Sequence, residues 1–326
     1  MFSRIQIENY RCFKQVDVPL RPLTVLVGGN NTGKSSFLEA IMLFERFSKT
    51  LEERDSWNCD TLNNVNLSIY SENNDSLEKY SLNTNWERRN NGFLEDLGDS
   101  RFVNEMKPFD RFSLPVQGVC MVSKGLSDGA GVPVLGSDGS GFPTLLDYLL
   151  RKDRRRLSQL IDAMKSFIPG LVDIDISTPD PSSRQLGLIL ENGLRLPADQ
   201  ASAGVRLILF FLALTFHPTP PKLILVEEPE TGVHPKRLAD IVGLLRDLTK
   251  GTHGLHPAQV ILTTHSPYLL DSIDPNVDQV LVFRRESDGS RSVKPVDVEG
   301  TKEFLDDFML GEVWFNVGED GLVAKH

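Results

Sequence analysis

The chain has 326 residues, with 35 basic and 45 acidic side chains and a formal net charge of −10. This charge excludes a protein whose whole surface is a polycationic nucleic-acid binder, although a local basic stripe remains possible. Apolar residues make up 40% of the chain and charged residues 25%, as is typical of a globular protein with an ordinary core.

Cysteine usage and hydropathy indicate the cellular compartment of the protein. The three cysteines, Cys12, Cys59 and Cys120, are too few and too far apart for a disulfide framework or a zinc site. The longest apolar run, residues 207–216, is too short to cross a bilayer, and the N-terminus has no apolar stretch of the secretory kind. We therefore expect a cytoplasmic protein without a membrane segment.

The N-terminal part alternates between strand and helix signals. Residues 2–8 alternate apolar and polar as a half-exposed strand does, and residues 23–27 form the continuous apolar run of a strand buried on both faces. Residues 35–47 carry the apolar stripe of a helix. Residues 50–115 are rich in Asn, Ser, Glu and Arg, and short alternating stretches such as 65–70 predict an antiparallel lobe.

The middle of the chain begins with a Gly/Ser-rich stretch at 123–142, which predicts a long loop. A helical pattern then runs from about Thr144 to Ile168 and stops at Pro169-Gly170. Residues 186–196 predict a hairpin, because Asn192-Gly193 at its centre favours a turn with two positive φ angles.

The remaining elements alternate. They are a helix at 203–216, a strand at 223–226, a helix at 235–249, a strand at 259–263 and a pair of strands near 280–296. Strands that alternate with helices predict a mainly parallel α/β core.

Residues 28–35, GGNNTGKS, fit the pattern G-x-x-x-x-G-K-[ST] between an apolar strand and a helix. Glycines let such a loop curve so that its backbone N–H groups surround phosphate oxygens at the positive end of the next helix. In this pattern Lys34 would bridge the β- and γ-phosphates, and the Ser35 hydroxyl would bind Mg²⁺. The segment therefore predicts a nucleotide site.

Two acids and a histidine follow later strands. Glu227 and Glu228 end an apolar strand, where ligands of α/β proteins commonly bind. One carboxylate would hold Mg²⁺ and the other would activate the attacking water. His265 ends the next strand and would sense the γ-phosphate or that water. The alternatives are a solvated acidic loop and a histidine that only satisfies local hydrogen bonds.

Two further features are weaker by themselves. Ser202 and Gly204 precede the most apolar helix, where they would bind an anion or simply cap a core helix. A basic run on a predicted helix would contact nucleic-acid phosphates or form a solvated helical face. Its members are Arg151, Lys152, Arg154, Arg155 and Arg156.

In this order, the motifs resemble those of the ABC-type ATPases of the RecF/SMC/OLD group, in particular its short stand-alone branch. IENYRCFKQVDVPL is similar to the N-terminal strand of the group, and GGNNTGKS to its Walker A motif. QASAGVR resembles the signature loop, LILVEEPETGVHP the Walker B motif and D-loop, and TTHSPYLLD the His switch. LGSDGSGFPTLLDYLL and LGEVWF also resemble segments of this branch.

The resemblance implies an α/β P-loop NTPase fold of the ABC ATPase type, with a mainly parallel sheet, an antiparallel β lobe and an inserted helical lobe. We expect one ATPase domain over residues 1–326. Its parts are N-terminal strands and P-loop in 1–50, an inserted β and loop lobe in 50–140, a helical lobe with the signature motif in 144–216, and a Walker B and His-switch lobe in 217–326.

The resemblance also implies a composite site, in which ATP and Mg²⁺ lie between two subunits. Glu228 would be the general base and His265 the second catalytic residue, while Ser35, Glu227 and Gln117 would contact the metal. The residues expected to contact the nucleotide are Arg11, Asn30, Asn31, Thr32, Gly33, Lys34, Ser35, Ser36, Ser202 and Gly204.

This sequence departs from the family pattern in three places. Ala201 stands where the signature usually has Leu, and Glu227 stands where ABC proteins generally have Asp. No Q-loop is evident, and Gln117, after a short apolar stretch, is the candidate. These departures argue against a transporter subunit.

The leading functional hypothesis is an ATP-driven switch that dimerises around ATP and acts on DNA or on an effector subunit, in anti-phage defence or DNA repair. Only 61 residues follow His265, so we expect a nuclease or toxin activity to reside in a partner. The alternatives are the nucleotide-binding subunit of a transporter and an assembly scaffold that binds ATP with little hydrolysis.

Overall fold

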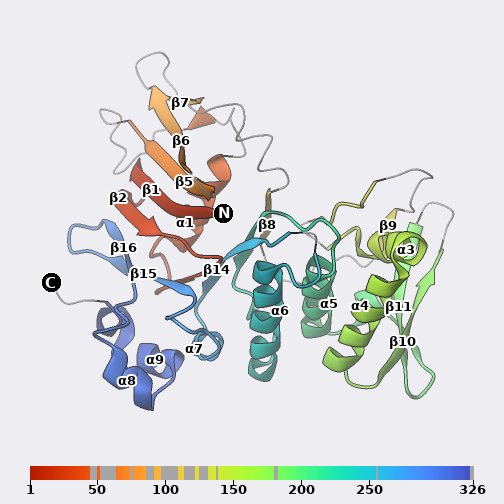
Figure 1. The fold of residues 1–326 in the computed structure, drawn as a ribbon. Helices are drawn as coiled ribbons and strands as arrows, with labels where there is room; N and C mark the ends of the chain where they lie inside the picture. Colours follow the sequence, from red (N-terminus) through yellow and green to blue (C-terminus); the bar gives the residue numbers. More distant parts are fainter. Residues whose placement is uncertain are drawn as a thin grey trace. The chain divides into compact units, whose positions relative to one another are not determined.

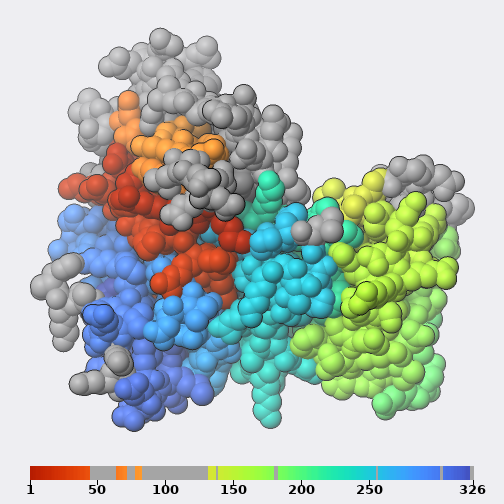
Figure 2. Space-filling model, viewed as in Figure 1, coloured from red at the N-terminus to blue at the C-terminus, as the bar shows by residue number. Residues whose placement is uncertain are grey.

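The computed structural model describes residues 1–44, 50–51, 64–73, 76–85, 92–96, 109–113, 122–124, 131–136, 139–179, 183–254 and 256–323. Figure 1 shows its helices and strands, and Figure 2 shows the same view as a space-filling model. The chain forms two compact units. Unit 1 comprises Met1–Arg111, Lys222–Glu227 and Gln259–His326, and unit 2 comprises Phe112–Pro221 and Glu228–Ala258.

The central sheet has the strand order β16-β15-β3-β14-β13-β8. Its middle strands β15, β3, β14 and β13 are parallel, and β16 is antiparallel to β15. All residues of β3 are buried, as its continuous apolar run predicted, and all residues of β14 are buried as well. The strands are β3 (Leu23–Val27), β8 (Phe109–Ser113), β13 (Leu223–Glu227), β14 (Gln259–Thr264), β15 (Gln279–Arg285) and β16 (Arg291–Pro295).

A second sheet in unit 1 has the order β2-β1-β5-β6-β7-β4, and its neighbours are antiparallel. The alternating N-terminal segment is confirmed as its strand β1. The polar region contributes β4 to β7, so the predicted antiparallel lobe is present in the described part. The strands are β1 (Phe2–Tyr10), β2 (Phe13–Pro19), β4 (Thr50–Leu51), β5 (Asn66–Asn73), β6 (Ser76–Asn85) and β7 (Gly92–Asp96).

Helix α1 (Lys34–Leu43) follows β3 and packs into the core of unit 1. Phe13 of β2, Phe37 of α1 and Phe283 of β15 meet edge to face, with ring centroids 5.5–6.5 Å apart. These rings fix the start of α1 against two strands. The C-terminal part of unit 1 adds α7 (Pro267–Leu270), α8 (Lys302–Asp307) and α9 (Leu310–Gly321).

Unit 2 contains a small antiparallel sheet and four longer helices (Figure 1). In α5 every residue from Leu207 to Thr215 is buried, and the helix packs against α6, α4 and α3. The strands are β9 (Val122–Lys124), β10 (Leu171–Ser177), β11 (Ser183–Leu190) and β12 (Arg195–Pro197). The helices are α3 (Phe142–Lys152), α4 (Arg154–Phe167), α5 (Ala203–Thr215) and α6 (Leu238–Lys250).

The prediction of one helix from about Thr144 to Ile168 is wrong. Asp153 ends α3 and begins α4, with φ −147° and ψ 72°. Its carboxylate accepts the backbone N–H of Arg156 at 3.1 Å, as an N-cap does. A polar residue inside a continuous apolar pattern therefore starts a new helix.

The predicted hairpin is present, but its turn differs from the expected type. Among the described residues, only four non-glycine residues have positive φ, and Asn192 is not one of them. Gly193 has φ 77°, and its N–H donates to the carbonyl of Leu190 at 2.8 Å. The Asn192 side chain accepts the N–H of Leu194 at 3.0 Å. The longer loop lets glycine alone take the left-handed conformation.

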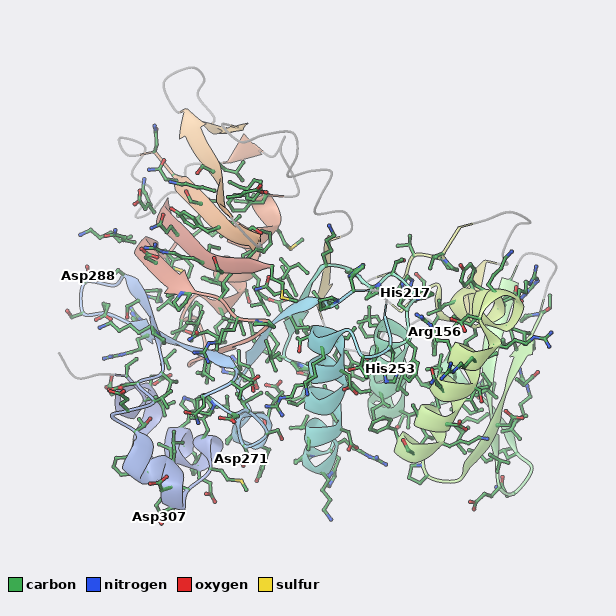
Figure 3. The ribbon with its side chains drawn as sticks, viewed as in Figure 1. Arg156, His217, His253, Asp271, Asp288 and Asp307 are labelled. Carbon is green, nitrogen blue, oxygen red and sulfur yellow. The ribbon has the colours of Figure 1, made fainter. Side chains whose placement is uncertain are left out.

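Two histidines of unit 2 lie close to Arg156 of α4 in Figure 3. His217 is 5% exposed, its Nε2 donates to the carbonyl of Pro133 at 2.7 Å, and its Nδ1 accepts the N–H of Thr219 at 3.1 Å. Burial lowers the pKa of His217 and also that of His253, whose ring stacks on Phe216. Both imidazoles are therefore held in the neutral form.

Among the residues that the structure describes, no helix is both long enough and apolar enough to span a bilayer.

Candidate functional site

Three predicted motifs lie at the C-terminal ends of parallel strands of the central sheet. The phosphate loop follows β3, Glu227 ends β13, and His265 follows β14. β14 lies between β3 and β13, and the strands are parallel. Thr264 pairs with Val27, the last residue before the phosphate loop, and Thr263 pairs with Glu227. Because neighbouring strands are about 5 Å apart, the start of the loop and Glu227 are about 10 Å apart across the sheet. His265 follows β14 between them.

The backbone of the loop at residues 28–33 can be formed only with glycine at its two ends. Gly28 has φ 152°, and a Cβ there would lie 2.5 Å from the carbonyl oxygen of Phe283. Gly33 has φ 103°, and a Cβ there would lie 2.8 Å from Cys12 Sγ. Burial raises the pKa of the Cys12 thiol, so it packs here as a neutral side chain.

The loop leads into a helix end suited to an anion. Gly33 is the N-cap of α1, no side chain caps the helix, and its first turn contains no acidic residue. The first backbone N–H groups of a helix lack partners within the helix and attract negative charge. Asn30, Asn31 and Ser35 are exposed beside them. These residues therefore fit a bound phosphate group.

Lys34 lies folded inside the loop and is only 6% exposed. Its Nζ donates to the carbonyl oxygens of Gly28 and Gly29, both at 2.8 Å. The Thr32 hydroxyl also donates to the Gly29 carbonyl, at 2.8 Å. The Lys34 ammonium group is thus held inside the curved backbone of the loop.

Two residues near the C-terminus hold the loop from outside. Glu319 Oε1 of α9 accepts the N–H of Gly29 at 2.7 Å. Arg291 Nε of β16 donates to the carbonyl of Asn31 at 2.9 Å, and Arg291 is 8% exposed. One peptide group therefore has both ends bound, because its Gly28 carbonyl accepts from Lys34 and its Gly29 N–H donates to Glu319.

Backbone strain coincides with the predicted site residues. The four non-glycine residues with positive φ in the described part are Asn9, Arg11, Asn31 and Glu228, with φ 52°, 50°, 60° and 44°. Three of them were assigned to the site from the sequence. Strained residues of this kind cluster at functional sites.

The other N-terminal candidates lie around α1. Arg11 forms an ion pair with Glu39 of α1 at 2.6 Å, and its guanidinium lies over the ring of Tyr10. Ser36 hydrogen-bonds Cys12, an interaction that opposes the rise in the thiol pKa. Both interactions therefore join α1 to the turn between β1 and β2.

The candidates from the signature segment belong to unit 2. Ser202 is the N-cap of α5, and its hydroxyl accepts the N–H of Val205 at 3.3 Å. A Cβ at Gly204 would meet no atom within 4 Å, so open space lies beside this glycine. Their role at a second subunit stays a prediction. Gln117 lies outside the described residues.

The basic run is divided between two helices. Arg151 pairs with Asp147 at 3.0 Å, and Arg156 pairs with Asp153 at 3.1 Å. The first pair lies within α3, and the second lies at the junction of α3 and α4. Lys152, Arg154 and Arg155 are exposed.

Sequence patterns did not point to the residues that hold the loop from outside. Glu319 and Gly29 are 290 positions apart, and Arg291 and Asn31 are 260 positions apart. Neither belongs to a phosphate-binding pattern. The only nearby signal was the family-like segment LGEVWF, which forms the start of α9 and ends four residues before Glu319.

Two family models and one curated relative match the sequence of this chain. Residues 1–108 match the family described as an AAA ATPase domain. Residues 127–271 match an AAA-domain family whose description names the AbiEii toxin of a type IV TA system. An OLD nuclease of Thermus scotoductus is 24% identical over 391 residues, which cover 100% of this chain and 70% of that protein.

Structural comparisons give SMC head domains. An SMC head bound to the C-winged helix domain of ScpA has a TM-score of 0.65 and 13% identity, over 93% of this chain and 99% of that one. The SMC head of Thermotoga maritima has a TM-score of 0.55 and 13% identity, over 91% and 99%. These structures share the P-loop NTPase fold. The matched families, the OLD nuclease relative and the motifs support an ATPase of the RecF/SMC/OLD-like group with this fold.

Proposed function

We propose that the chain is an ATP-binding and ATP-hydrolysing switch, which dimerises around ATP in the cytoplasm and regulates a separate effector or acts on DNA. The observation that carries this proposal is the meeting of the phosphate loop, Glu227 and His265 at one edge of the sheet. The similarity to an OLD nuclease supports action on DNA, and the family description that names the AbiEii toxin of a type IV TA system supports a link to an effector. The SMC head bound to ScpA supports the use of a partner subunit.

The residues present suit ATP and Mg²⁺, which together supply a cleavable γ-phosphate with its charge partly neutralised. Backbone N–H groups of residues 31–35 and the Lys34 ammonium would hold the phosphates, while the Ser35 hydroxyl and Glu227 would hold the metal. The Glu228 carboxylate would accept a proton from the attacking water, and His265 would hydrogen-bond near that water.

The negative charge of the bound nucleotide would also hold the dimer together. Ser202 and Gly204 of a second subunit would bring the N-terminus of α5 to the γ-phosphate. A helix N-terminus favours negative charge, so loss of the γ-phosphate would remove the contact that closes the dimer.

The experiment measures ATP binding, ATP hydrolysis and molar mass in solution for the wild type, Lys34→Ala and Glu228→Gln. The wild type should hydrolyse ATP, and Lys34→Ala should not bind it. Glu228→Gln should bind ATP and remain dimeric until the nucleotide is removed. A wild type that binds no ATP would contradict the proposal. Binding without turnover would favour an assembly scaffold, and full turnover in Glu228→Gln would exclude that residue as the base.

A further inference from the structure

The two C-terminal helices expose an unusual amount of apolar surface. We call this surface the α8–α9 face, and its members are Phe304, Phe308, Met309, Phe315 and Val317. Phe315 is 76% exposed and Met309 60%. Large apolar side chains gathered on one surface commonly mark a site of protein contact, because their burial releases water.

A cavity of about 620 Å³ is lined by two members of this face, Phe304 and Val317. Phe304, Val317 and Val323 give it apolar walls, while Asp297 and Asp320 bring carboxylates to it. Asp320 also pairs with Arg284 of β15. Such a lining suits a side chain with an apolar stem and a cationic end, as lysine and arginine have.

The same segment has a strong net negative charge. Residues 297–320 contain eight acidic residues and one lysine, so they account for seven of the ten net negative charges. Asp306, Asp307 and Glu312 are exposed, and Figure 3 shows Asp307 at the outer side of α8. Two copies of this face would therefore repel each other if they met.

We propose that the exposed apolar side chains of α8 and α9, together with the cavity lined by Phe304 and Val317, form the docking surface for a basic, amphipathic segment of a partner protein. Apolar side chains of the partner would cover the exposed phenylalanines, and its lysines or arginines would face the acidic rim and enter the cavity. Charge complementarity favours this occupant over a second copy of the chain. The inference does not depend on ATP hydrolysis.

A binding experiment with the whole chain tests this surface. The probe is a fluorescent helical peptide with leucines on one side and lysines on the other, and its anisotropy is measured at physiological salt. Two comparison peptides replace the lysines by glutamates or the leucines by serines. The wild type should bind the first peptide at least about tenfold more tightly than either comparison.

Variants locate the binding. Phe315→Ser, and separately the pair Asp306→Lys with Asp307→Lys, should each weaken binding about tenfold with an unchanged melting temperature. The matched controls are Val277→Ser, at a 65% exposed position before β15, and the pair Asp162→Lys with Asp173→Lys in unit 2. These controls should bind as the wild type does.

Three outcomes would overturn the proposal. The first is equal binding of all three peptides, and the second is unchanged binding by both face variants. The third is a wild-type dimer, seen without nucleotide by light scattering, that Phe315→Ser converts to a monomer. That result would make the face a contact between copies of the chain.

Discussion

Glu228 adopts the left-handed conformation, with φ 44°. For an L-residue other than glycine or asparagine this conformation costs about 1–2 kcal/mol. The turn that follows is fixed by a hydrogen bond from the Thr231 N–H to the Glu228 carbonyl at 3.0 Å. This strain directly after β13 lowers stability, and it supports the proposed catalytic role of Glu228.

Glu228→Gly should separate stability from activity. Glycine adopts positive φ without a Cβ clash, so we expect the free energy of unfolding to rise by up to about 1 kcal/mol. ATP turnover should fall to background, since the carboxylate is lost. Asn31→Gly is the matched comparison, and asparagine tolerates this conformation better, so its gain should be smaller. A Glu228→Gly variant that is less stable than the wild type would contradict the strain argument.

Glu319 should affect ATP binding through the peptide between Gly28 and Gly29. In Glu319→Ala the Gly29 N–H loses a charged acceptor, and a hydrogen bond of this kind is worth about 1.5 kcal/mol. We therefore expect the ATP dissociation constant, measured by calorimetry, to rise about tenfold. Glu319→Gln retains an acceptor and should recover most of the affinity.

Asp320→Asn is the control for Glu319, because it removes the same charge from the neighbouring position. It should leave ATP affinity unchanged. If Asp320→Asn weakens binding as much as Glu319→Ala does, the effect is one of charge near the site, not of the hydrogen bond.

At the scale of elements, the junction of α3 and α4 decides what the basic run can do. Arg156 is tied to the Asp153 cap, whereas Arg154 and Arg155 are exposed, with Arg154 Nε donating to the Leu150 carbonyl at 3.2 Å. Arg154→Glu with Arg155→Glu should therefore weaken any DNA binding and lower its dependence on salt, because phosphate contacts release counterions. The melting temperature should not change. DNA affinity equal to that of the wild type at several salt concentrations would remove the run from any DNA contact.

The elements that the sequence predicted well are those with one dominant signal. β3 is buried on both faces along its whole length, so its apolar run was sufficient. The phosphate loop was predicted because its pattern is local, with glycines at Gly28 and Gly33 where the backbone requires them. Local patterns of this kind predict local structure without knowledge of distant contacts.

The elements that were missed depend on single polar atoms or on distant partners. The apolar periodicity continues from Leu149 to Leu157 and Leu160, so it could not reveal that the Asp153 carboxylate starts a new helix. The support of the loop by Glu319 depends on a contact across 290 positions. No pattern in one sequence encodes such a contact.

At the scale of the whole molecule, the two neutral histidines link stability to pH. Burial lowers the pKa of His217 and His253 in the folded state, whereas the unfolded chain has the ordinary value of about 6.5. Below that pH the unfolded state binds more protons, so stability is full above about pH 6.5 and falls as pH decreases.

We therefore expect the melting temperature to fall between about pH 7.5 and pH 5.5. Asp271 cannot cause this fall. Burial raises the pKa of its carboxyl, which has the opposite effect on stability as pH decreases. A melting temperature that stays constant over this range would show that the histidines titrate normally in the folded chain.

Helix α9 connects two surfaces that serve different ligands. It exposes Phe315, and four residues further along Glu319 accepts the Gly29 N–H. If a ligand on the first surface displaces Glu319, it changes the affinity of the loop for its own ligand. Thermodynamic linkage then requires the loop ligand to change the first affinity by the same factor. Measuring either effect would therefore fix the size of the other.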